Sequence, residues 1–330
     1  MVSEKIKAGV IGVGHLGQHH AKHYHLRNDV TLAGVYDTDS NRAKEIARQY
    51  NTKFFDTPQD LMEICDGISI VTPTESHYSI AKIAIEDFNC HVFIEKPITE
   101  TTVQADDLIK SAKAKNKLIQ VGHIERLNPA LTILEQYNLN PKFIEVQRLA
   151  PYTVRGTDVP VVLDLMIHDI DILLSLVKSD VKSIHASGVS IITNSVDIAN
   201  ARIRFNNGTV ASITSSRVAK DKVRKIKLFQ ENLYSTIDLL LEQTEIYTIT
   251  EEPNLIPDVL KTEPFTQNNE SKLIAYQKPN LEKYDMLGLE IKNFIASVRG
   301  KEEPIVNGIE ARNALDVVIK INNMILEDLK

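Results

Sequence analysis

The sequence predicts an α/β protein in which a doubly wound parallel sheet, within residues 1–123, precedes an α+β domain, residues 124–330, with a largely antiparallel sheet. In the first part, short unbroken apolar runs alternate with stretches of helical period, which is typical of parallel strands covered on both faces. In the second part, strand-like segments follow one another with turn residues between them, which is typical of hairpins. A length of 330 residues suits two domains.

The predicted strands of the first domain are six apolar runs. Helical patterns lie between most of them, for example at residues 42–49, 79–87 and 103–115. Six strands in this rhythm fit a dinucleotide-binding domain. The runs are Ile6–Ile11, Thr31–Tyr36, Lys53–Phe55, Gly67–Val71, His91–Ile94 and Leu118–Gly122.

The second domain is predicted to begin with a helix at Pro129–Tyr137, a strand at 143–149 and a very apolar helix at Val161–Val177. Asn206-Asn207-Gly208 predicts a tight hairpin, because Asn and Gly tolerate positive φ. Residues 250–282 are polar and rich in proline, so we expect a long loop with a short strand near 273–277. Two helices close the chain, and further strands precede the loop. The further strands are Ser183–Ile192, Asp197–Phe205, Thr209–Val218, Lys225–Gln230 and Leu233–Leu240, and the two closing helices are Gly288–Arg299 and Gly308–Leu329.

Composition and charge exclude several classes of protein. Lys and Arg number 38 against 44 Asp and Glu, for a formal net charge of −6, whereas nucleic-acid proteins need a basic face. No apolar run reaches the roughly 18 residues of a membrane span, and no signal-peptide core precedes the first strand. Cys65 and Cys90 lie beside apolar strands, which favours two buried thiols over a redox pair. We therefore expect a cytoplasmic protein without nucleic-acid or membrane partners.

A glycine-rich loop, Gly12-Val13-Gly14-His15-Leu16-Gly17, directly follows the first predicted strand and opens a helix. Gly12 permits a tight turn, Gly14 lets the backbone approach a pyrophosphate, and Gly17 allows close packing of helix on strand. Asp37 ends the second strand 20 residues after Gly17. A carboxylate there accepts hydrogen bonds from the adenosine ribose and repels a 2′-phosphate, so the loop predicts a Rossmann domain that binds NAD rather than NADP.

The helix after this loop is rich in histidine, and His19 and His23 have the i, i+4 spacing of a metal-binding pair. No cysteine cluster or third ligand accompanies them. We therefore interpret these residues as exposed or packing histidines and expect no metal.

The apolar helix at Val161–Val177 carries three titratable groups on one stripe. A helix that is apolar almost all round is buried, and buried polar side chains cost free energy unless they are paired. At about 100° per residue, with Asp164 at zero, His168 falls near 40° and Asp171 near −20°. A carboxylate four residues from a histidine orients the imidazole for proton transfer. The alternative is a capping Asp with a core histidine.

Two further motifs end predicted strands of the first domain. Glu95-Lys96-Pro97 closes the fifth strand, and Thr72-Pro73 with His77 follows the fourth. The carboxyl ends of parallel strands line the ligand crevice, so we expect Lys96 to face the cofactor. A lysine near a reacting hydroxyl lowers its pKa or relays its proton. The alternative for Lys96 is a solvated side chain.

Together these motifs resemble those of the Gfo/Idh/MocA family of sugar and polyol oxidoreductases, over essentially the whole chain. The resemblance implies a Rossmann domain and an open-faced, largely antiparallel sheet that mediates oligomerisation, as a homodimer or homotetramer. It also implies NAD(P)-linked oxidation of a secondary alcohol, or the reverse reduction. The motifs that carry it are the glycine loop, Thr72-Pro73…His77, Glu95-Lys96-Pro97, Arg126…Pro129 and Asp164-x3-His168-x2-Asp171.

The resemblance also implies roles for individual residues. Lys96 and His168 would handle the hydroxyl proton, with Asp164 assisting. Tyr152 and Arg155, in the loop before the apolar helix, are candidate contacts to a sugar or diphosphate; a simply solvated Arg is an equal alternative. The expected cofactor contacts are Gly12, Gly14, His15, Leu16, Gly17, Asp37, Thr72, Pro73, His77, Glu95 and Lys96. The expected substrate contacts are Lys96, Arg126, Tyr152, Arg155, Asp164, His168 and Asp171.

Two departures from the family pattern narrow the expectation. His123 and Glu125 stand where the family often has an aromatic residue and an Asn, and no Gly precedes His168. Both variants resemble the branch that oxidises the 3-hydroxyl of UDP-N-acetylglucosamine in lipid A precursor synthesis. Two alternatives stay open: a dehydrogenase of a free polyol, inositol or simple sugar, and a non-catalytic NAD-binding regulatory protein. For the enzyme, we expect chemistry at an interdomain cleft.

Overall fold

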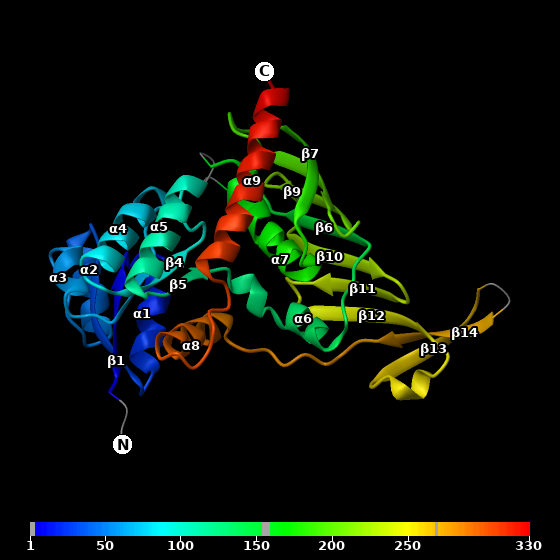
Figure 1. The fold of residues 1–330 in the computed structure, drawn as a ribbon, viewed down its shortest axis with the longest axis horizontal. Helices are drawn as coiled ribbons and strands as arrows, with labels where there is room; N and C mark the ends of the chain where they lie inside the picture. The colour runs from blue at the N-terminus through cyan, green and yellow to red at the C-terminus, as the bar shows by residue number, and fades with distance from the viewer. Residues whose placement is uncertain (1–3, 154–158, 268–269) are drawn as a thin grey trace. The chain divides into compact units, whose positions relative to one another are not determined.

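The computed structural model describes residues 4–153, 159–267 and 270–330, which form two compact units (Figure 1). The first unit runs to Ile124 and adds residues 285–316; the second holds residues 125–284 and 317–330. The sequence places one boundary at residue 123 and assigns everything after it to a second domain. In the structure residues 285–316 belong with the first unit, since Phe294 packs its ring against Phe93 at 5.7 Å.

The described residues of the first unit include a five-stranded parallel sheet in the order β2-β1-β3-β4-β5. This confirms the predicted parallel sheet, but the strand predicted at Lys53–Phe55 is wrong. Phe54 forms only an isolated bridge to Val35, because these three residues lie outside the edge strand and are too few for a ladder. The strands are β1 (Ile6–Ile11), β2 (Val30–Tyr36), β3 (Gly67–Ile70), β4 (His91–Glu95) and β5 (Ile119–Gly122).

Helices connect these strands, and several begin at side-chain caps. Asp39 caps α2 by accepting hydrogen bonds from the N–H groups of Asn41 and Arg42. Thr101 and Gln104 form a reciprocal capping box on α5. The helices are α1 (Gly17–Leu26), α2 (Ser40–Gln49), α3 (Pro58–Met62), α4 (Thr74–Glu86), α5 (Thr102–Lys115), α8 (Met286–Val298) and the beginning of α9 (Gly308–Asp328).

The second unit contains, among its described residues, a nine-stranded sheet in the order β13-β14-β12-β11-β10-β6-β9-β8-β7. Only the β6–β9 pairing is parallel within these ladders, so the predicted, largely antiparallel sheet is confirmed. The hairpin predicted at Asn206-Asn207-Gly208 joins β8 to β9, with Gly208 at a φ of 91°. The strands up to this turn are β6 (Phe143–Leu149), β7 (Val181–Val189) and β8 (Ile198–Phe205), followed by β9 (Val210–Ser216), β10 (Val223–Gln230) and β11 (Leu233–Asp238).

The long loop predicted for residues 250–282 is wrong for most of its length, whereas the short strand expected near 273–277 is present as the end of β14. The chain forms β12 (Gln243–Thr250), then the short helix η4 (Pro253–Leu255), and then a hairpin of β13 (Val259–Gln267) and β14 (Glu270–Gln277). In Figure 1 this hairpin extends beyond the other strands of its unit. Pro264 is tolerated because β13 is an edge strand, and the polar composition suits strands that lie in solvent. Polarity and proline therefore did not indicate a loop here.

One face of the larger sheet is covered by helices. Burial alternates along β8, where Ala199 and Ile203 are buried while Arg202 is exposed. On the covered side, α6 contacts β11 and β12, and η3 contacts β9. The segments are η1 (Ile124–Leu127), α6 (Pro129–Thr132), η2 (Ile133–Gln136), η3 (Val162–Met166) and α7 (Ile167–Val177), with the end of α9.

Within the described ranges, no helix combines the length and apolar character that crossing a membrane would require. Cys65 and Cys90 are both buried free thiols, as predicted. Burial raises the pKa of Cys90 to about 11, so the thiol stays protonated at neutral pH.

Candidate active site

The glycine loop follows β1 with the geometry that its spacing predicts. Gly12 has a φ of 84°, and a Cβ there would lie 2.5 Å from the carbonyl oxygen of Val71. A Cβ on Gly17 would lie 1.8 Å from the carbonyl oxygen of Gly12, so α1 packs against the loop with no room for a side chain. Around Gly14, in contrast, nothing lies within 4 Å of an added Cβ. The backbone there is open to a ligand.

The N-terminus of α1 has no side-chain cap. Leu16 occupies the N-cap position without a capping hydrogen bond, and both His15 and Leu16 are exposed. Free N–H groups and the positive end of the helix dipole therefore meet solvent next to Gly14. This combination binds pyrophosphate in dinucleotide folds.

Asp37 lies just beyond the end of β2 and is tied to the glycine loop. Its Oδ2 accepts a hydrogen bond from the N–H of Val13 at 2.8 Å, and its Oδ1 accepts one from the N–H of Asp39 at 2.9 Å. A carboxylate offers about four lone-pair positions, so these two contacts leave acceptor capacity for ribose hydroxyls. The structure thus fixes the orientation of the Asp37 carboxylate beside the glycine loop.

The turns after β3 and β4 are linked by His77. Its Nδ1 lies 2.9 Å from the carbonyl oxygen of Pro97, and its Nε2 lies 2.8 Å from that of Thr72. The ring is buried, and burial lowers the pKa of His77. Pro73 is the N-cap of α4, and the Lys96-Pro97 peptide bond is cis. His77 therefore lies between these two turns; because both partners are carbonyl oxygens, its neutral ring donates to one of them, according to the tautomer.

In the second unit, Asp164 lies in the π-helical segment η3 and His168 lies in the first turn of α7. The prediction of one continuous α-helix over Val161–Val177 is wrong at its beginning. A π-helical turn is wider, so the angles calculated at 100° per residue between Asp164 and later residues do not hold. Asp164 and His168 are half-buried, which leaves both accessible to a ligand. Short π-helical turns are frequent at functional sites.

Asp171 differs from the other two groups because it is buried in an ion pair. Arg126 donates from Nε to Oδ2 at 2.6 Å and from Nη2 to Oδ1 at 2.9 Å. The structure thus joins two predicted substrate contacts to each other. Tyr152 is 42% exposed. Arg155 lies outside the described residues.

Next to this pair lies a buried charge network that the sequence analysis did not identify. Arg148 donates two hydrogen bonds to Asp169, at 2.8 and 2.9 Å, and one to Glu125 at 3.1 Å. Arg224 donates to the same Glu125 oxygen at 3.0 Å. Charged side chains from η1, β6 and β10 therefore anchor α7 at Asp169, the residue that follows His168. One signal was present in the sequence, because Arg148 continues the inward-facing alternation of Ile144 and Val146.

Comparisons with known proteins decide the family. Residues 6–123 match the NAD-binding Rossmann domain of an oxidoreductase family, and residues 134–232 match the GFO/IDH/MocA C-terminal domain. The chain belongs to the Gfo/Idh/MocA family. It is 33% identical to UDP-N-acetylglucosamine 3-dehydrogenase of Acidithiobacillus ferrooxidans over 96% of each chain. A solved structure of that enzyme matches with a TM-score of 0.88 at 32% identity, covering 99% of both chains.

A second relative of this Gfo/Idh/MocA protein acts on a different class of substrate. Myo-inositol 2-dehydrogenase of Thermotoga maritima is 25% identical over 94% of this chain and 93% of the relative. The chain is accordingly an NAD-dependent dehydrogenase. The open backbone at Gly14, the uncapped α1 and the fixed Asp37 fit NAD. No cluster of metal-ligating side chains occurs among the residues for which the structure gives positions.

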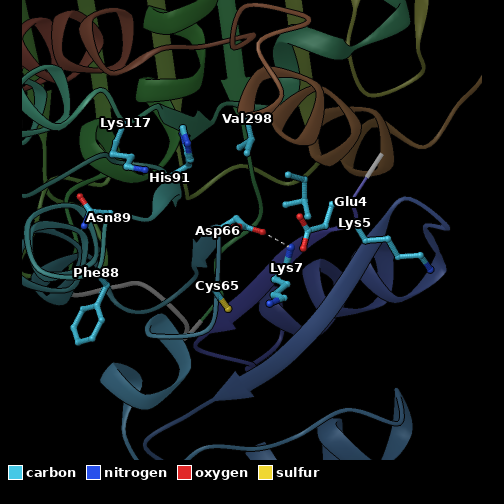
Figure 2. Close-up of a pocket in the computed structure, with 11 residues that line it drawn as sticks. Glu4, Lys5, Lys7, Cys65, Asp66, Phe88, Asn89, His91, Lys117 and Val298 are labelled. Atoms are coloured by element: carbon cyan, nitrogen blue, oxygen red, sulfur yellow. Dashed lines mark hydrogen bonds between the residues drawn. The ribbon is translucent and has the colours of Figure 1, made fainter. Parts of the chain in front are cut away.

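A polar cavity lies at the opposite edge of the Rossmann sheet. Figure 2 shows Lys7, Asp66, His91 and Lys117 around it, at the amino ends of the strands. Cofactors of such folds bind at the carboxyl ends of the strands, so we assign this cavity no part in the chemistry.

His91, in this cavity, should make stability depend on pH. Burial and the nearby Lys117 lower the pKa of His91 to about 4, while Nδ1 accepts a hydrogen bond from the N–H of Leu118 at 3.1 Å. Between pH 6.5 and 4 the unfolded chain binds a proton that the folded chain does not, so stability falls as the pH falls. We expect His91→Asn, which keeps an acceptor but does not titrate, to lose less Tm than wild type over this interval. Parallel Tm curves would contradict the assignment.

Proposed function

We propose that this protein oxidises the 3-hydroxyl of a UDP-N-acetylhexosamine, most simply UDP-N-acetylglucosamine, with NAD as hydride acceptor. The observation that carries the proposal is the similarity to UDP-N-acetylglucosamine 3-dehydrogenase, which extends over 96% of each chain at 33% identity. The inositol relative is less similar, at 25% identity. Two buried free cysteines suit a reducing compartment, and we place the reaction in the cytoplasm.

Within this proposal, the protein's own side chains handle the proton while bound NAD supplies the hydride acceptor. Oxidation of a secondary alcohol removes a proton from the hydroxyl oxygen and a hydride from the carbon that bears this hydroxyl. Lys96 and His168 are the proposed proton-handling groups, and Asp164 assists them. His168 is half-buried on a helix held by Arg148 and Arg126, which suits a group that must keep one orientation during proton transfer.

The Arg126–Asp171 pair is the proposed substrate contact at the next turn of α7. Asp171 is 1% exposed and its two oxygens already accept from the guanidinium. A sugar hydroxyl at this position would therefore meet a preformed ion pair. Tyr152 is a proposed contact to the sugar, and the same proposal holds for Arg155.

The substrate assignment is tested by NADH formation with purified protein and a panel of alcohols. We expect turnover with UDP-N-acetylglucosamine and little with UDP-glucose, myo-inositol or free N-acetylglucosamine. Activity restricted to inositol or free sugars would reject the nucleotide sugar. Tight NAD binding without turnover on any alcohol would support the regulatory alternative instead.

We also propose that the open face of the larger sheet is covered by a second copy of the chain. Five aromatic rings lie in register across neighbouring strands of this sheet, with centroids 4.7 to 5.9 Å apart. In a monomer such a row exposes a large apolar surface to solvent, and self-association removes this surface from water. The five residues are Phe143, Phe229, Tyr234, Tyr247 and Tyr276.

Tyr234→Lys should weaken this self-association. Tyr234 stands in the middle of the row, stacked between Phe229 and Tyr247, so a charge there would be buried in the interface. Light scattering after size exclusion should show a shift to a smaller species. Glu63→Lys, an exposed substitution in the first unit, serves as the control. An unchanged mass for Tyr234→Lys would place the interface elsewhere.

A further inference from the structure

A chain of hydrogen-bonded side chains runs beneath the turn that carries Lys96. The hydroxyl oxygens of Tyr24 and Ser69 lie 2.7 Å apart. Ser69 Oγ lies 3.2 Å from Nδ1 of His20, and Nε2 of His20 lies 3.1 Å from Oε1 of Glu95. Tyr24, Ser69 and His20 are fully buried. The chain thus leads from the core of the first unit to the residue just before Lys96.

The direction of each hydrogen bond follows from its end at Glu95. A carboxylate only accepts, so Nε2 of His20 must carry the hydrogen. In a neutral ring with its hydrogen on Nε2, Nδ1 has a lone pair and accepts from the hydroxyl of Ser69. Ser69 then accepts from Tyr24, and burial raises the pKa of Tyr24, which keeps its hydroxyl a donor. In this pattern each of the three hydrogen bonds has one donor and one acceptor.

Glu95 is also confined on its other side. A Cβ added to Gly122 would lie 2.8 Å from Oε1 of Glu95, so the carboxylate rests against the backbone of β5. Two residues later the chain is held again, because Nδ1 of His77 lies 2.9 Å from the carbonyl oxygen of Pro97. Lys96 therefore stands between two points of attachment, one on each side along the chain.

We propose that His20 is a positioning residue for Lys96. By donating to Glu95 it fixes the end of β4 and the direction in which Lys96 leaves the strand. The buried hydroxyls of Ser69 and Tyr24 hold His20 in the tautomer that makes this donation. The inference rests on the proposed role of Lys96 in turnover, and it gives a function to a histidine that the sequence indicated only as a packing residue.

Two variants of His20 separate its two contacts. In His20→Asn the shorter side chain still reaches Ser69 but not Glu95, whereas His20→Gln places its amide nitrogen near the position of Nε2. We expect His20→Asn to lower kcat by at least about tenfold with little change in the NADH dissociation constant, and His20→Gln to recover most of the rate. His19→Asn, at an exposed neighbour on the same helix, is the control. Equal kcat values for His20→Asn and His20→Gln would overturn the proposal.

A double variant tests whether His20 acts through Glu95. In a Glu95→Ala background, His20→Asn should cause no further loss of kcat, because the contact that it removes is already absent. Multiplying effects would mean that His20 acts by another route and would overturn the proposal. Full turnover in Lys96→Ala would remove the role of Lys96 itself, whereas full turnover in His20→Asn alone would overturn only the positioning of Lys96.

The tautomer offers a readout that does not depend on activity. In protein labelled with ¹⁵N-histidine and free of cofactor, the neutral ring of His20 should give the NMR signature of the tautomer with its hydrogen on Nε2. Ser69→Ala should weaken this preference, because Nδ1 then loses its donor. A ring protonated at Nδ1, or at both nitrogens, would overturn the proposed direction of the chain.

Discussion

Lys96→Ala and His168→Ala are each expected to lower kcat by about 10²–10⁴-fold, the range that a positioned proton-transfer group contributes. Both residues are proposed to handle the proton of the reacting hydroxyl, one at the carboxyl end of β4 and the other at the start of α7. NAD binding should survive both changes, because the glycine loop and Asp37 are untouched. Steady-state kinetics with UDP-N-acetylglucosamine and NADH titration followed by fluorescence provide the two measurements.

Matched controls keep this result specific. Lys113→Ala and His185→Ala remove the same chemical groups at exposed positions and should leave kcat unchanged. If Lys96→Ala lost NAD affinity in proportion to its rate, Lys96 would be a binding residue rather than a proton-handling one. Near-normal turnover in either alanine variant would contradict its proposed role.

Arg148→Met is expected to lower the free energy of unfolding by about 3–5 kcal/mol, the usual cost of removing one partner from a buried ion pair. The guanidinium of Arg148 is 3% exposed and donates to both Asp169 and Glu125. Without it, two carboxylates that are almost fully buried lose a shared cation, and among the described ion pairs Arg224 stays with Glu125. Urea unfolding followed by circular dichroism measures the loss.

Two companion variants test the cause of that loss. Arg148→Lys keeps the positive charge but cannot bond Asp169 through two nitrogens in one plane, so it should fall between wild type and Arg148→Met. Arg224→Met removes a side chain that is 42% exposed, and we expect a change of at most about 1 kcal/mol. If Arg148→Met lowered the free energy of unfolding by as little as Arg224→Met, burial would not strengthen the ion pairs of this network.

The cofactor half of the site could be predicted from sequence because its signals are local. Gly12, Gly14 and Gly17 lie within six residues, and their spacing dictates a turn that the structure reproduces with a φ of 84° at Gly12. Asp37 follows at the end of the next strand. Each residue acts through backbone geometry that its own neighbours determine, so no distant contact was needed to identify it.

The buried side chains that hold the candidate site in place could not be predicted in the same way. His20 meets Glu95 across 75 positions of sequence, and Glu125 meets Arg224 across 99. In the sequence His20 is one of five histidines between positions 15 and 25, and nothing local separates it from exposed His19. Only packing shows which of them is buried, because burial depends on which element covers the helix face.

The sequence by itself determined the parallel strands β1 to β5, the glycine loop and the family motifs, since apolar period and turn chemistry are properties of short segments. Tertiary structure decided that residues 285–316 join the first unit, that residues 259–267 pair with residues 270–277, and that the helix bearing Asp164 begins with a π-helical turn. It also decided that Asp171 pairs with Arg126. These outcomes depend on contacts between segments far apart along the chain, where the free energy of pairing buried charges and covering apolar faces outweighs local preference.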